Sequence, residues 1–444
     1  MMTGLARDGG LYLPETIPQM THADIAALAG LPYEEVTARV LAPFMSDAFA
    51  SDEFRVLIAR AYAGFAHTAR APLVQLAPGH FLLELFHGPT LAFKDFAMQL
   101  LGQMMQATLA RTGHRITIVG ATSGDTGSAA MEAFRGLENV DLFILYPQGR
   151  VSEVQRRQMT TPTEANVHAL AIDGTFDDAQ ARVKDMFNDF DFRDAVGLAG
   201  VNSINIARVL AQVVYYFAAA SALGAPGREV DFTVPTGNFG DIFAGLVAKR
   251  MGLPIGRLVV ATNQNDILHR CLSTGAYRPD GVMPTISPSM DIQVSSNFER
   301  ALYYAHGADA AATAALMDDL KAGGFTLSQG VRDALAADFA SGRASEDETA
   351  ATITRTLAQT GELLCPHSAV GVHVAEQHLR AGVPMVTLAT AHPAKFPDAV
   401  QAATGIRPAL PPHMAGLYDR PERLTHVPND LAALETLIHE RRRA

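Results

Sequence analysis

The chain has few cysteines and no hydrophobic run long enough to cross a membrane. Its two cysteines, Cys271 and Cys365, form no CxxC pair, which argues against a disulfide framework or a zinc knuckle and suits a reducing compartment. The most apolar stretch, residues 209–225, falls short of the roughly 20 residues of a membrane span. Because it also includes Gln212 and Ser221, we expect it to form a buried helix.

Positive charge is also scarce. There are 35 Lys and Arg against 46 Asp and Glu, the formal net charge is −11, and the only dense basic cluster is residues 441–443. An acidic chain without a basic face repels nucleic acid and anionic membranes, and the first residues lack the regions of a signal peptide. We expect a cytoplasmic protein that binds neither nucleic acid nor membrane and needs no obligate protein partner.

Short β-branched runs alternate with amphipathic stretches from about residue 80 onward, a pattern typical of parallel sheets built from βαβ units. No internal repeat indicates a solenoid. Ligands of such sheets bind in the loops that follow the carboxyl ends of strands. The runs that predict strands, of which the last is 384–390, are residues 115–120, 141–147, 167–172, 230–237, 257–263 and 384–390.

The sequence GATSGDTGSAA, residues 120–130, follows the first of these predicted strands. Its glycines let backbone N–H groups turn inward, and the helix behind adds the positive end of its dipole. Thr122, Ser123 and Thr126 add hydroxyl donors. The pattern indicates an anion site; the alternative is a capping turn with Asp125 or Thr126 as the N-cap.

Two further loops have similar features. VPTGNFGDIFAG, residues 234–245, runs from strand to glycine loop to helix, and the N–H groups of residues 237–240 can cradle a phosphate. It matches neither the dinucleotide-binding nor the P-loop pattern. In VNSINIAR, residues 201–208, Asn202 and Ser203 stand at the expected start of a long helix. With Arg208 they can bind a second phosphate, although caps and a helical arginine are also ordinary features.

Lys94 is the only lysine in residues 84–102 and lies near Phe93 and Phe96 at the expected start of a helix. Desolvation lowers the pKa of a lysine and leaves its amine free to attack an aldehyde. With two anion loops, Lys94 therefore suits a Schiff base with pyridoxal phosphate. The alternatives are a lysine whose end simply reaches water, or Lys395 in PAKF as a weaker rival.

Five motifs in order resemble those of the threonine synthases, in the longer subgroup of many bacteria and yeasts. They are HGPTLAFKDFA, GATSGDTGSAA, VNSINIAR, PTGNFGDI and LATAHPAKF, and the resemblance extends over essentially the whole chain. It implies an α/β fold with two doubly wound parallel-sheet domains of the tryptophan-synthase-β type and a helical N-terminal domain. It also implies pyridoxal 5'-phosphate as the cofactor and conversion of O-phospho-L-homoserine and water to L-threonine and phosphate.

The resemblance also implies roles for individual residues. Lys94 matches the Schiff-base lysine, and Thr390 matches the hydroxyl that faces the pyridine nitrogen. The loop matched to the cofactor phosphate consists of Gly237, Asn238, Phe239 and Gly240. The loop matched to the substrate carboxylate consists of Ser123, Gly124, Asp125 and Thr126, with Thr122 beside them. The residues matched to the substrate phosphate are Asn202, Ser203 and Arg208.

We expect the following domain boundaries from this fold. The segments are a helical N-terminal domain at 1–75, a large cofactor domain at 76–95 and 206–400 with a helical insertion at about 266–365, a small α/β domain at 96–205, and a C-terminal segment at 401–444. The chain departs from the family at its start, because members usually begin earlier, with a segment containing STRG before GLARDGGLYLP. We expect this departure to concern only the N-terminal contacts that the family makes and to leave the catalytic motifs untouched.

Other activities fit less well. A phospho-lyase that forms 2-oxobutyrate and ammonia from O-phosphohomoserine needs the same loops. Dehydratase and cysteine-synthase substrates lack the second phosphate that Asn202, Ser203 and Arg208 can bind. A catalytically inactive binding protein is expected to have lost Lys94 or a glycine loop. We expect His87 and His392 to be hydrogen-bonded packing residues.

Overall fold

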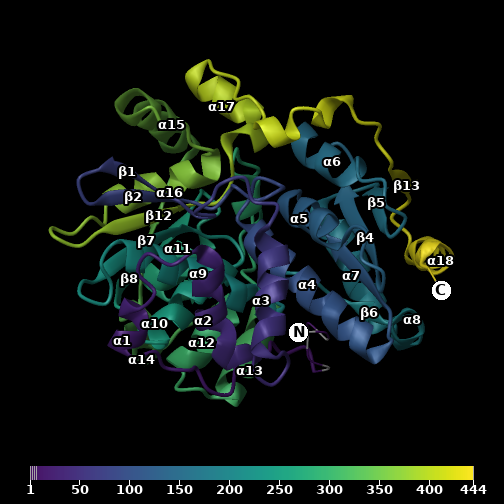
Figure 1. The fold of residues 1–444 in the computed structure, drawn as a ribbon, viewed down its shortest axis with the longest axis horizontal. Helices are drawn as coiled ribbons and strands as arrows, with labels where there is room; N and C mark the ends of the chain where they lie inside the picture. Colours follow the sequence, from purple (N-terminus) through teal and green to yellow (C-terminus); the bar gives the residue numbers. More distant parts are fainter. Residues whose placement is uncertain (1, 3, 5, 7, 444) are drawn as a thin grey trace.

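Two sheets of mainly parallel strands, each covered by helices, make up most of the molecule (Figure 1). The structure is a computed structural model that describes residues 2, 4, 6 and 8–443. The predicted α/β fold, with two parallel-sheet regions and an N-terminal helical region, is confirmed.

The larger sheet has six strands in the order β1-β2-β12-β7-β8-β11. β1 and β2 form an antiparallel hairpin, and the other neighbours pair in parallel. Because β12 pairs with both β2 and β7, the loops that follow these three strands emerge at one edge. The strands are β1 Leu73–Ala77, β2 His80–Glu84, β7 Val230–Pro235, β8 Ile255–Thr262, β11 Phe339–Arg343 and β12 Met385–Ala389.

The smaller sheet is parallel throughout, in the order β13-β5-β4-β3-β6. The last clear strand pattern in the sequence, at 384–390, is followed by one further short strand, because the C-terminal segment returns to pair β13 with β5 (Figure 1). The strands are β3 Ile116–Ala121, β4 Val140–Pro147, β5 Val167–Ile172, β6 Leu198–Ala199 and β13 Thr425–Val427; β9 Ala276–Tyr277 and β10 Phe325–Thr326 form a separate antiparallel pair.

Alternation along the strands places one core on each face of a sheet. In β8, Leu258 and Val260 join the main core with helices α9 and α10, while Val259 and Ala261 pack with α16 on the other face. The same alternation in the smaller sheet separates the face against α4 and α5 from the face against α7 and α18. Both sheets are therefore buried on two sides, as parallel sheets require.

The helices cover the sheets and connect parallel neighbours. They are α1 His22–Ala26, α2 Tyr33–Met45, α3 Ser51–Tyr62, α4 Lys94–Thr112, α5 Asp125–Phe134, α6 Glu153–Thr160, α7 Phe176–Asn188, α8 Phe190–Val196, α9 Ile206–Ala222, α10 Gly240–Arg250, α11 Ile267–Thr274, α12 Phe298–Ala305, α13 Ala310–Lys321, α14 Gln329–Ala336, α15 Glu346–Thr360, α16 Pro366–Glu376, α17 Pro397–Thr404 and α18 Leu431–Arg441. The 3-10 turns in the described part of the chain are η1 Pro288–Met290, η2 Pro393–Lys395, η3 Pro412–Met414 and η4 Leu417–Asp419.

The N-terminal helices are packed onto the rest of the molecule. α2 lies against α9, and α3 lies against α4. The rings of Tyr33, Tyr62 and Phe96 pack edge to face or tilted, and the Tyr62 hydroxyl donates to the Phe96 carbonyl at 3.2 Å. This layer therefore supports the helix that begins at Lys94.

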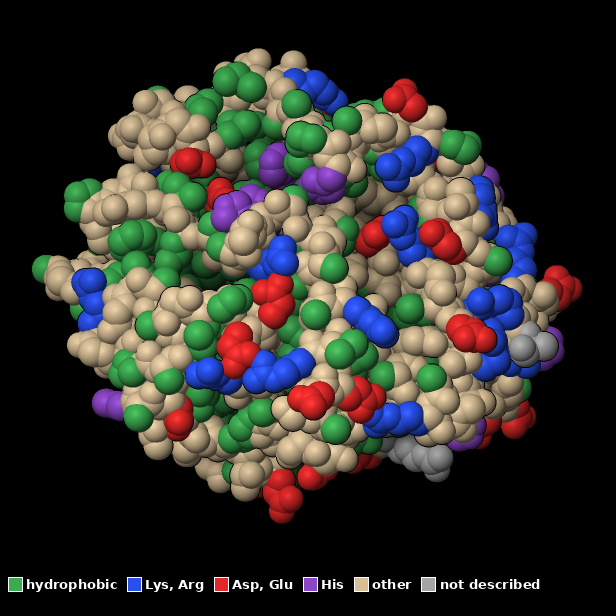
Figure 2. Space-filling view, viewed as in Figure 1, with side chains coloured by type: hydrophobic (Ala, Val, Ile, Leu, Met, Phe, Trp, Pro, Cys, Tyr) green, Lys and Arg blue, Asp and Glu red, His purple; other side chains and the backbone are tan. Residues whose placement is uncertain are grey.

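The most apolar stretch of the sequence forms α9, which is buried as expected. In the part of the chain that the structure describes, no helix is long and apolar enough for a membrane crossing. Lys and Arg side chains are interspersed with Asp and Glu on the face seen in Figure 2. The region 266–365 is mainly helical but also supplies β11, the edge strand of the larger sheet.

Candidate active site

Lys94 is the first residue of α4, where the sequence predicts a helix start. The preceding turn wraps around the buried carboxylate of Asp95. This carboxylate accepts hydrogen bonds from the Thr90 backbone N–H at 2.8 Å and from the Thr90 hydroxyl at 2.6 Å. Gly88 is required here, because a Cβ would lie 2.5 Å from the Asp95 side chain. The turn therefore fixes the point at which Lys94 leaves the backbone.

The Lys94 side chain is only 13% exposed, and its Nζ lies 3.5 Å from Oδ2 of Asp125. Burial lowers the pKa of Lys94; Asp125 opposes this effect, and Arg208 and Lys395 lower the pKa further. A lysine whose pKa is lowered presents more neutral amine, the form that acts as nucleophile or base. The alternative of a side chain that merely reaches water does not fit these surroundings.

Thr390 follows β12 and is buried. The backbone N–H of Phe93 donates to the Thr390 carbonyl at 2.9 Å, and Ala92 forms a bridge with Ala391. Two motifs about 300 residues apart in the sequence thus meet at the edge of the larger sheet, with Thr390 next to the residue that precedes Lys94.

Thr122 organises the loop between β3 and α5. Its hydroxyl accepts hydrogen bonds from the N–H groups of Gly124 and Gly127, each at 2.9 Å. The alternative of a capping turn with Asp125 or Thr126 as N-cap is wrong, because Gly124, with φ of 135°, is the N-cap and the helix begins at Asp125. Within the described residues the N–H groups of Asp125 and Thr126, at the start of the helix, have no acceptor and remain as donors for an anion.

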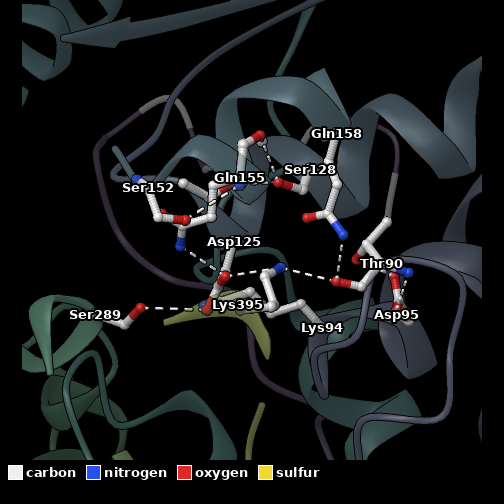
Figure 3. A network of polar contacts seen from close by, with 12 residues as sticks. Thr90, Lys94, Asp95, Asp125, Ser128, Ser152, Gln155, Gln158, Ser289 and Lys395 are labelled. Carbon is white, nitrogen blue, oxygen red and sulfur yellow. Dashed lines mark hydrogen bonds and ion pairs between the residues drawn. The ribbon is translucent and has the colours of Figure 1, made fainter. Parts of the chain in front are cut away.

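The Asp125 carboxylate is fully engaged by the protein (Figure 3). Its Oδ1 lies 2.9 Å from Lys395 Nζ and accepts a hydrogen bond of 2.9 Å from Gln155, while Oδ2 faces Lys94 and accepts a hydrogen bond of 3.3 Å from Ser289. Burial raises the pKa of Asp125, but Lys395 and Lys94 outweigh it and hold the pKa below its usual range. An ionised Asp125 side chain repels a substrate carboxylate, so only the backbone N–H of this residue suits that ligand. The neighbouring residues Ser123 and Thr126 are partly exposed.

The loop between β7 and α10 is held by its carbonyl groups. The Gly237 carbonyl accepts from the Ser295 hydroxyl at 2.6 Å, and the Asn238 carbonyl accepts from the backbone and side chain of Asn297 at 3.0 and 2.8 Å. Phe239 is buried with a φ of 63°. Within the described residues the N–H groups of residues 237–240 have no acceptor, so they are available to a phosphate.

Asn202 and Ser203 lie in the turn before α9. The expectation that they start the helix is wrong, because Asn205 is the N-cap and α9 begins at Ile206. The Ser203 hydroxyl lies 3.5 Å from that of Ser296, which donates to the Asn238 side chain at 3.3 Å. This turn is therefore adjacent to the loop of residues 237–240.

Arg208 extends from α9 into the interior and is 2% exposed. One Nη donates to the Val201 carbonyl at 3.1 Å, whereas its buried Nε has no partner among the described residues. Burial lowers the pKa of Arg208 to about 10, so the side chain is still a cation at neutral pH. An unsatisfied buried guanidinium N–H is suited to an anionic ligand.

Several residues of the site were not predicted from the sequence. Gln155, Ser289 and Asn297 are ordinary polar residues whose contacts appear only when distant segments meet. Asp241, in the first turn of α10, accepts hydrogen bonds from the hydroxyls of Tyr215 and Tyr216. Burial raises the pKa of Asp241 to about 7. For Lys395 one sequence feature indicates a place in the site, namely its position inside the motif LATAHPAKF.

The two histidines of the motifs lie outside this network. His87 is 2.7 Å from the Glu84 carboxylate, and His392 Nδ1 accepts from the Ala394 N–H at 3.1 Å. Both line a surface cleft of about 720 Å³. Among the described residues no group of three His, Cys, Asp or Glu is arranged to hold a metal ion.

Residues 66–315 match the family described as pyridoxal-phosphate dependent enzyme. This match covers more than half of the chain, so fold and site define an enzyme of the pyridoxal-phosphate-dependent class. Residues 1–62 match the description threonine synthase N terminus, and residues 368–438 match threonine synthase, C-terminal.

The threonine synthase of Pseudomonas aeruginosa is 53% identical over 450 residues, which cover 99% of this chain and 94% of that protein. The crystal structure of PLP-bound threonine synthase from Brucella melitensis is 58% identical, with a TM-score of 0.97 and coverage of 99% of this chain and 95% of that chain. The yeast enzyme structure is 40% identical, with a TM-score of 0.92 and coverage of 99% and 94%. The chain therefore belongs to the threonine synthase family.

The predicted cofactor, pyridoxal phosphate, is confirmed by this membership. The residues present fit it. Lys94 supplies an amine of lowered pKa, and the loop of residues 237–240 supplies free N–H groups. A Cβ at Gly237 would lie 2.8 Å from the Ser289 carbonyl oxygen, so at this position the loop has room for backbone only. The assignment of individual residues to cofactor and substrate stays a prediction.

Proposed function

We propose that the protein is a threonine synthase, which converts O-phospho-L-homoserine and water to L-threonine and phosphate at Lys94. The observation that carries this proposal is the position of the Lys94 amine. It lies beside Asp125 of one N–H-rich loop, and Arg208 and the second loop supply further anion-binding groups. Membership of the threonine synthase family supports the same reaction.

Each anionic group has a binding site in this proposal. The N–H groups of residues 237–240 hold the cofactor phosphate, and the Thr390 hydroxyl meets the pyridine nitrogen. The hydroxyls of Ser123 and Thr126, with the first-turn N–H groups of α5, hold the substrate carboxylate. The Arg208 guanidinium, with Asn202 and Ser203, holds the substrate phosphate.

Pyridoxal phosphate, when bound, supplies a conjugated ring that stabilises negative charge at the substrate α-carbon. The Lys94 amine takes the proton from Cα, which requires the neutral amine that burial favours. The phosphate then leaves Cγ and takes up the proton that Lys94 removed from Cα, a proton moves from Cβ to Cγ, and the hydroxyl and proton of water are added at Cβ and Cα. Arg208 holds the phosphate in place as its bond breaks.

Replacement of Lys94 by alanine tests this assignment. Lys94→Ala is expected to lose the cofactor absorbance at about 420 nm and to reduce threonine formation by about a thousandfold or more. The measurements are a visible spectrum, phosphate and threonine assays, and peptide mass analysis after borohydride reduction. A variant with normal absorbance and turnover, or an adduct on another lysine, contradicts the proposal.

Product analysis separates the two reactions that the same loops allow. The expected product is threonine; accumulation of 2-oxobutyrate and ammonia instead identifies a phospho-lyase. The cytoplasmic location, and independence from nucleic acid, membranes and obligate protein partners, stay predictions of the same proposal.

A further inference from the structure

A second lysine, Lys395, is buried in the same network without a role in the proposed reaction. It ends the 3-10 turn η2, and its side chain is 0% exposed. Its Nζ lies 2.9 Å from Asp125 Oδ1 and donates to the Thr90 carbonyl at 2.8 Å (Figure 3). A buried ammonium is tolerated only where it is paired and hydrogen-bonded, and both conditions are met here.

Asp125 connects this lysine to Lys94. One carboxylate oxygen faces Lys395 and the other faces Lys94, at 2.9 and 3.5 Å. Gln155 and Ser289 bind one oxygen each, so the carboxylate is held from both sides. The two lysines thus share one negative charge.

We propose that Lys395 is a positioning residue that holds the Asp125 carboxylate in place and thereby sets how tightly the Lys94 nitrogen holds its proton. This inference rests on the proposed role of Lys94. With Lys395 absent, Asp125 has Lys94 as its only cationic partner within 4 Å among the described residues. A carboxylate with a single cationic neighbour favours the protonated form of that neighbour more strongly, which opposes nucleophilic attack and proton removal.

Other groups around Lys94 set the background for this effect. Burial lowers the pKa of His367 to about 4, so its ring is neutral near pH 7, whereas Arg208 remains cationic. Among the described residues Asp125 is the only acidic residue that pairs with both lysines within 4 Å. The titratable and charged groups that face Lys94 are Asp125 from α5, Arg208 from α9, Asp241 from α10, His367 from α16 and Lys395 from η2.

A double-mutant cycle tests the inference with Lys395→Met, Asp125→Asn and the double variant. The apoenzyme readout is the pH midpoint for the rate at which Lys94 captures added pyridoxal phosphate, because only the neutral amine reacts. The holoenzyme readout is the pH titration of the cofactor's visible band.

Lys395→Met is expected to raise both midpoints by about one pH unit or more, because Asp125 then acts on the Lys94 nitrogen alone. Asp125→Asn is expected to lower them, because Lys395 then lacks its ion-pair partner and its positive charge opposes protonation of Lys94. The double variant, which lacks both charges, is expected to return within about half a unit of the unchanged protein, so the single effects are not independent.

Lys249 provides a matched control, since it is paired with Asp338 at 3.0 Å and donates to the Gly256 carbonyl at 3.2 Å away from the site. Lys249→Met should move neither midpoint.

If Lys395→Met alone fails to fold, the double variant is compared with Asp125→Asn instead. The double variant lacks both charges of the pair, whereas Asp125→Asn keeps Lys395, so the midpoint of the double variant should be the higher of the two. A purely structural Lys395 lowers stability without moving a midpoint, and that result overturns the inference.

Borohydride trapping in each variant separates this inference from the proposed function. An adduct on Lys94 with an unmoved midpoint refutes only the role of Lys395. An adduct on Lys395 or another lysine overturns both proposals.

Discussion

The loops after β3 and β7 begin alike and are then held in opposite ways. Each strand is followed by a buried threonine whose N–H extends the parallel ladder, from Thr122 to the Leu145 carbonyl at 3.0 Å and from Thr236 to the Ala261 carbonyl at 2.8 Å. Glycines and a helix follow in both. Sequence pattern and topology therefore give the two loops equivalent positions in their sheets.

The threonine hydroxyls point in different directions. Thr122 accepts hydrogen bonds from two N–H groups of its own loop, whereas Thr236 donates back to the Val234 carbonyl at 2.6 Å. The first loop has thus used two of its donors internally, and the second keeps those of residues 237–240. A phosphate has more oxygens and more charge than a carboxylate, so this difference favours the cofactor phosphate in the second loop and the substrate carboxylate in the first.

An aspartate lies in the first turn of each helix, and the two differ in charge. The two lysines hold the pKa of Asp125 low, whereas burial raises the pKa of Asp241 to about 7, with two tyrosine hydroxyls as its partners. An ionised aspartate beside a phosphate loop would repel the ligand. The contrast teaches that equivalent positions acquire different electrostatics from the segments packed onto them.

Among changes within the two loops, the largest expected effect comes from a methyl group added to the second loop. In Gly237→Ala the new Cβ would lie 2.8 Å from the Ser289 carbonyl oxygen, and overpacking of this kind costs about 1–3 kcal/mol. We expect cofactor affinity to fall by roughly 10- to 100-fold, measured by absorbance titration of the apoenzyme. Gly330→Ala, where the Cβ meets no atom within 4 Å, should leave affinity unchanged. Equal affinity in both variants would show that the loop is not the phosphate site.

Asp241 gives a pH-dependent effect in the apoenzyme. The pKa of this group is about 7 when folded, against an ordinary value of 3.8, so between these values the folded state binds more protons than the unfolded state. Its contribution to the free energy of unfolding therefore falls as pH rises, by about 1.4 kcal/mol per pH unit. Asp241→Asn removes this dependence.

Urea unfolding at pH 5, 6 and 7 measures that difference. The unfolding free energy of Asp241→Asn, relative to the unchanged apoenzyme, should increase with pH over this range. Asp47→Asn, at an exposed position, should give a nearly constant difference. If the unfolding free energies of Asp241→Asn and of the unchanged apoenzyme differ by the same amount at all three pH values, the Asp241 carboxylate is ionised in the folded state.

The sequence predicts what depends on local signals. The helix start at Lys94, the strand–glycine–helix units and the buried helix α9 follow from hydrophobic pattern and glycine placement, and the structure has them. The start of α9 is displaced from Asn202 and Ser203, because Asn205 forms the cap bond. Cap choice among neighbouring polar residues is decided by loop geometry.

What the sequence does not predict depends on contacts between distant segments. Lys395 meets Asp125 across 270 positions, and β13, with three residues, has no pattern of its own until it pairs with β5. Nothing local distinguishes Asn297, which holds the Asn238 carbonyl. Thr122 and Thr236 could not be told apart either, because hydroxyl direction is set by the fold.

The smallest expected effect tests the difference between the hydroxyls of Thr122 and Thr236 directly. Thr122→Val leaves two buried N–H groups without an acceptor, at about 1–3 kcal/mol, and should distort the first loop while the cofactor loop stays intact. We expect kcat/KM for O-phospho-L-homoserine to fall by roughly tenfold, with unchanged cofactor affinity. Thr236→Val loses only a donor to a strand carbonyl and should change kcat/KM by less than about threefold. Steady-state kinetics beside cofactor titration measure both, and a reversed order of the two effects would exchange the assignments of the loops.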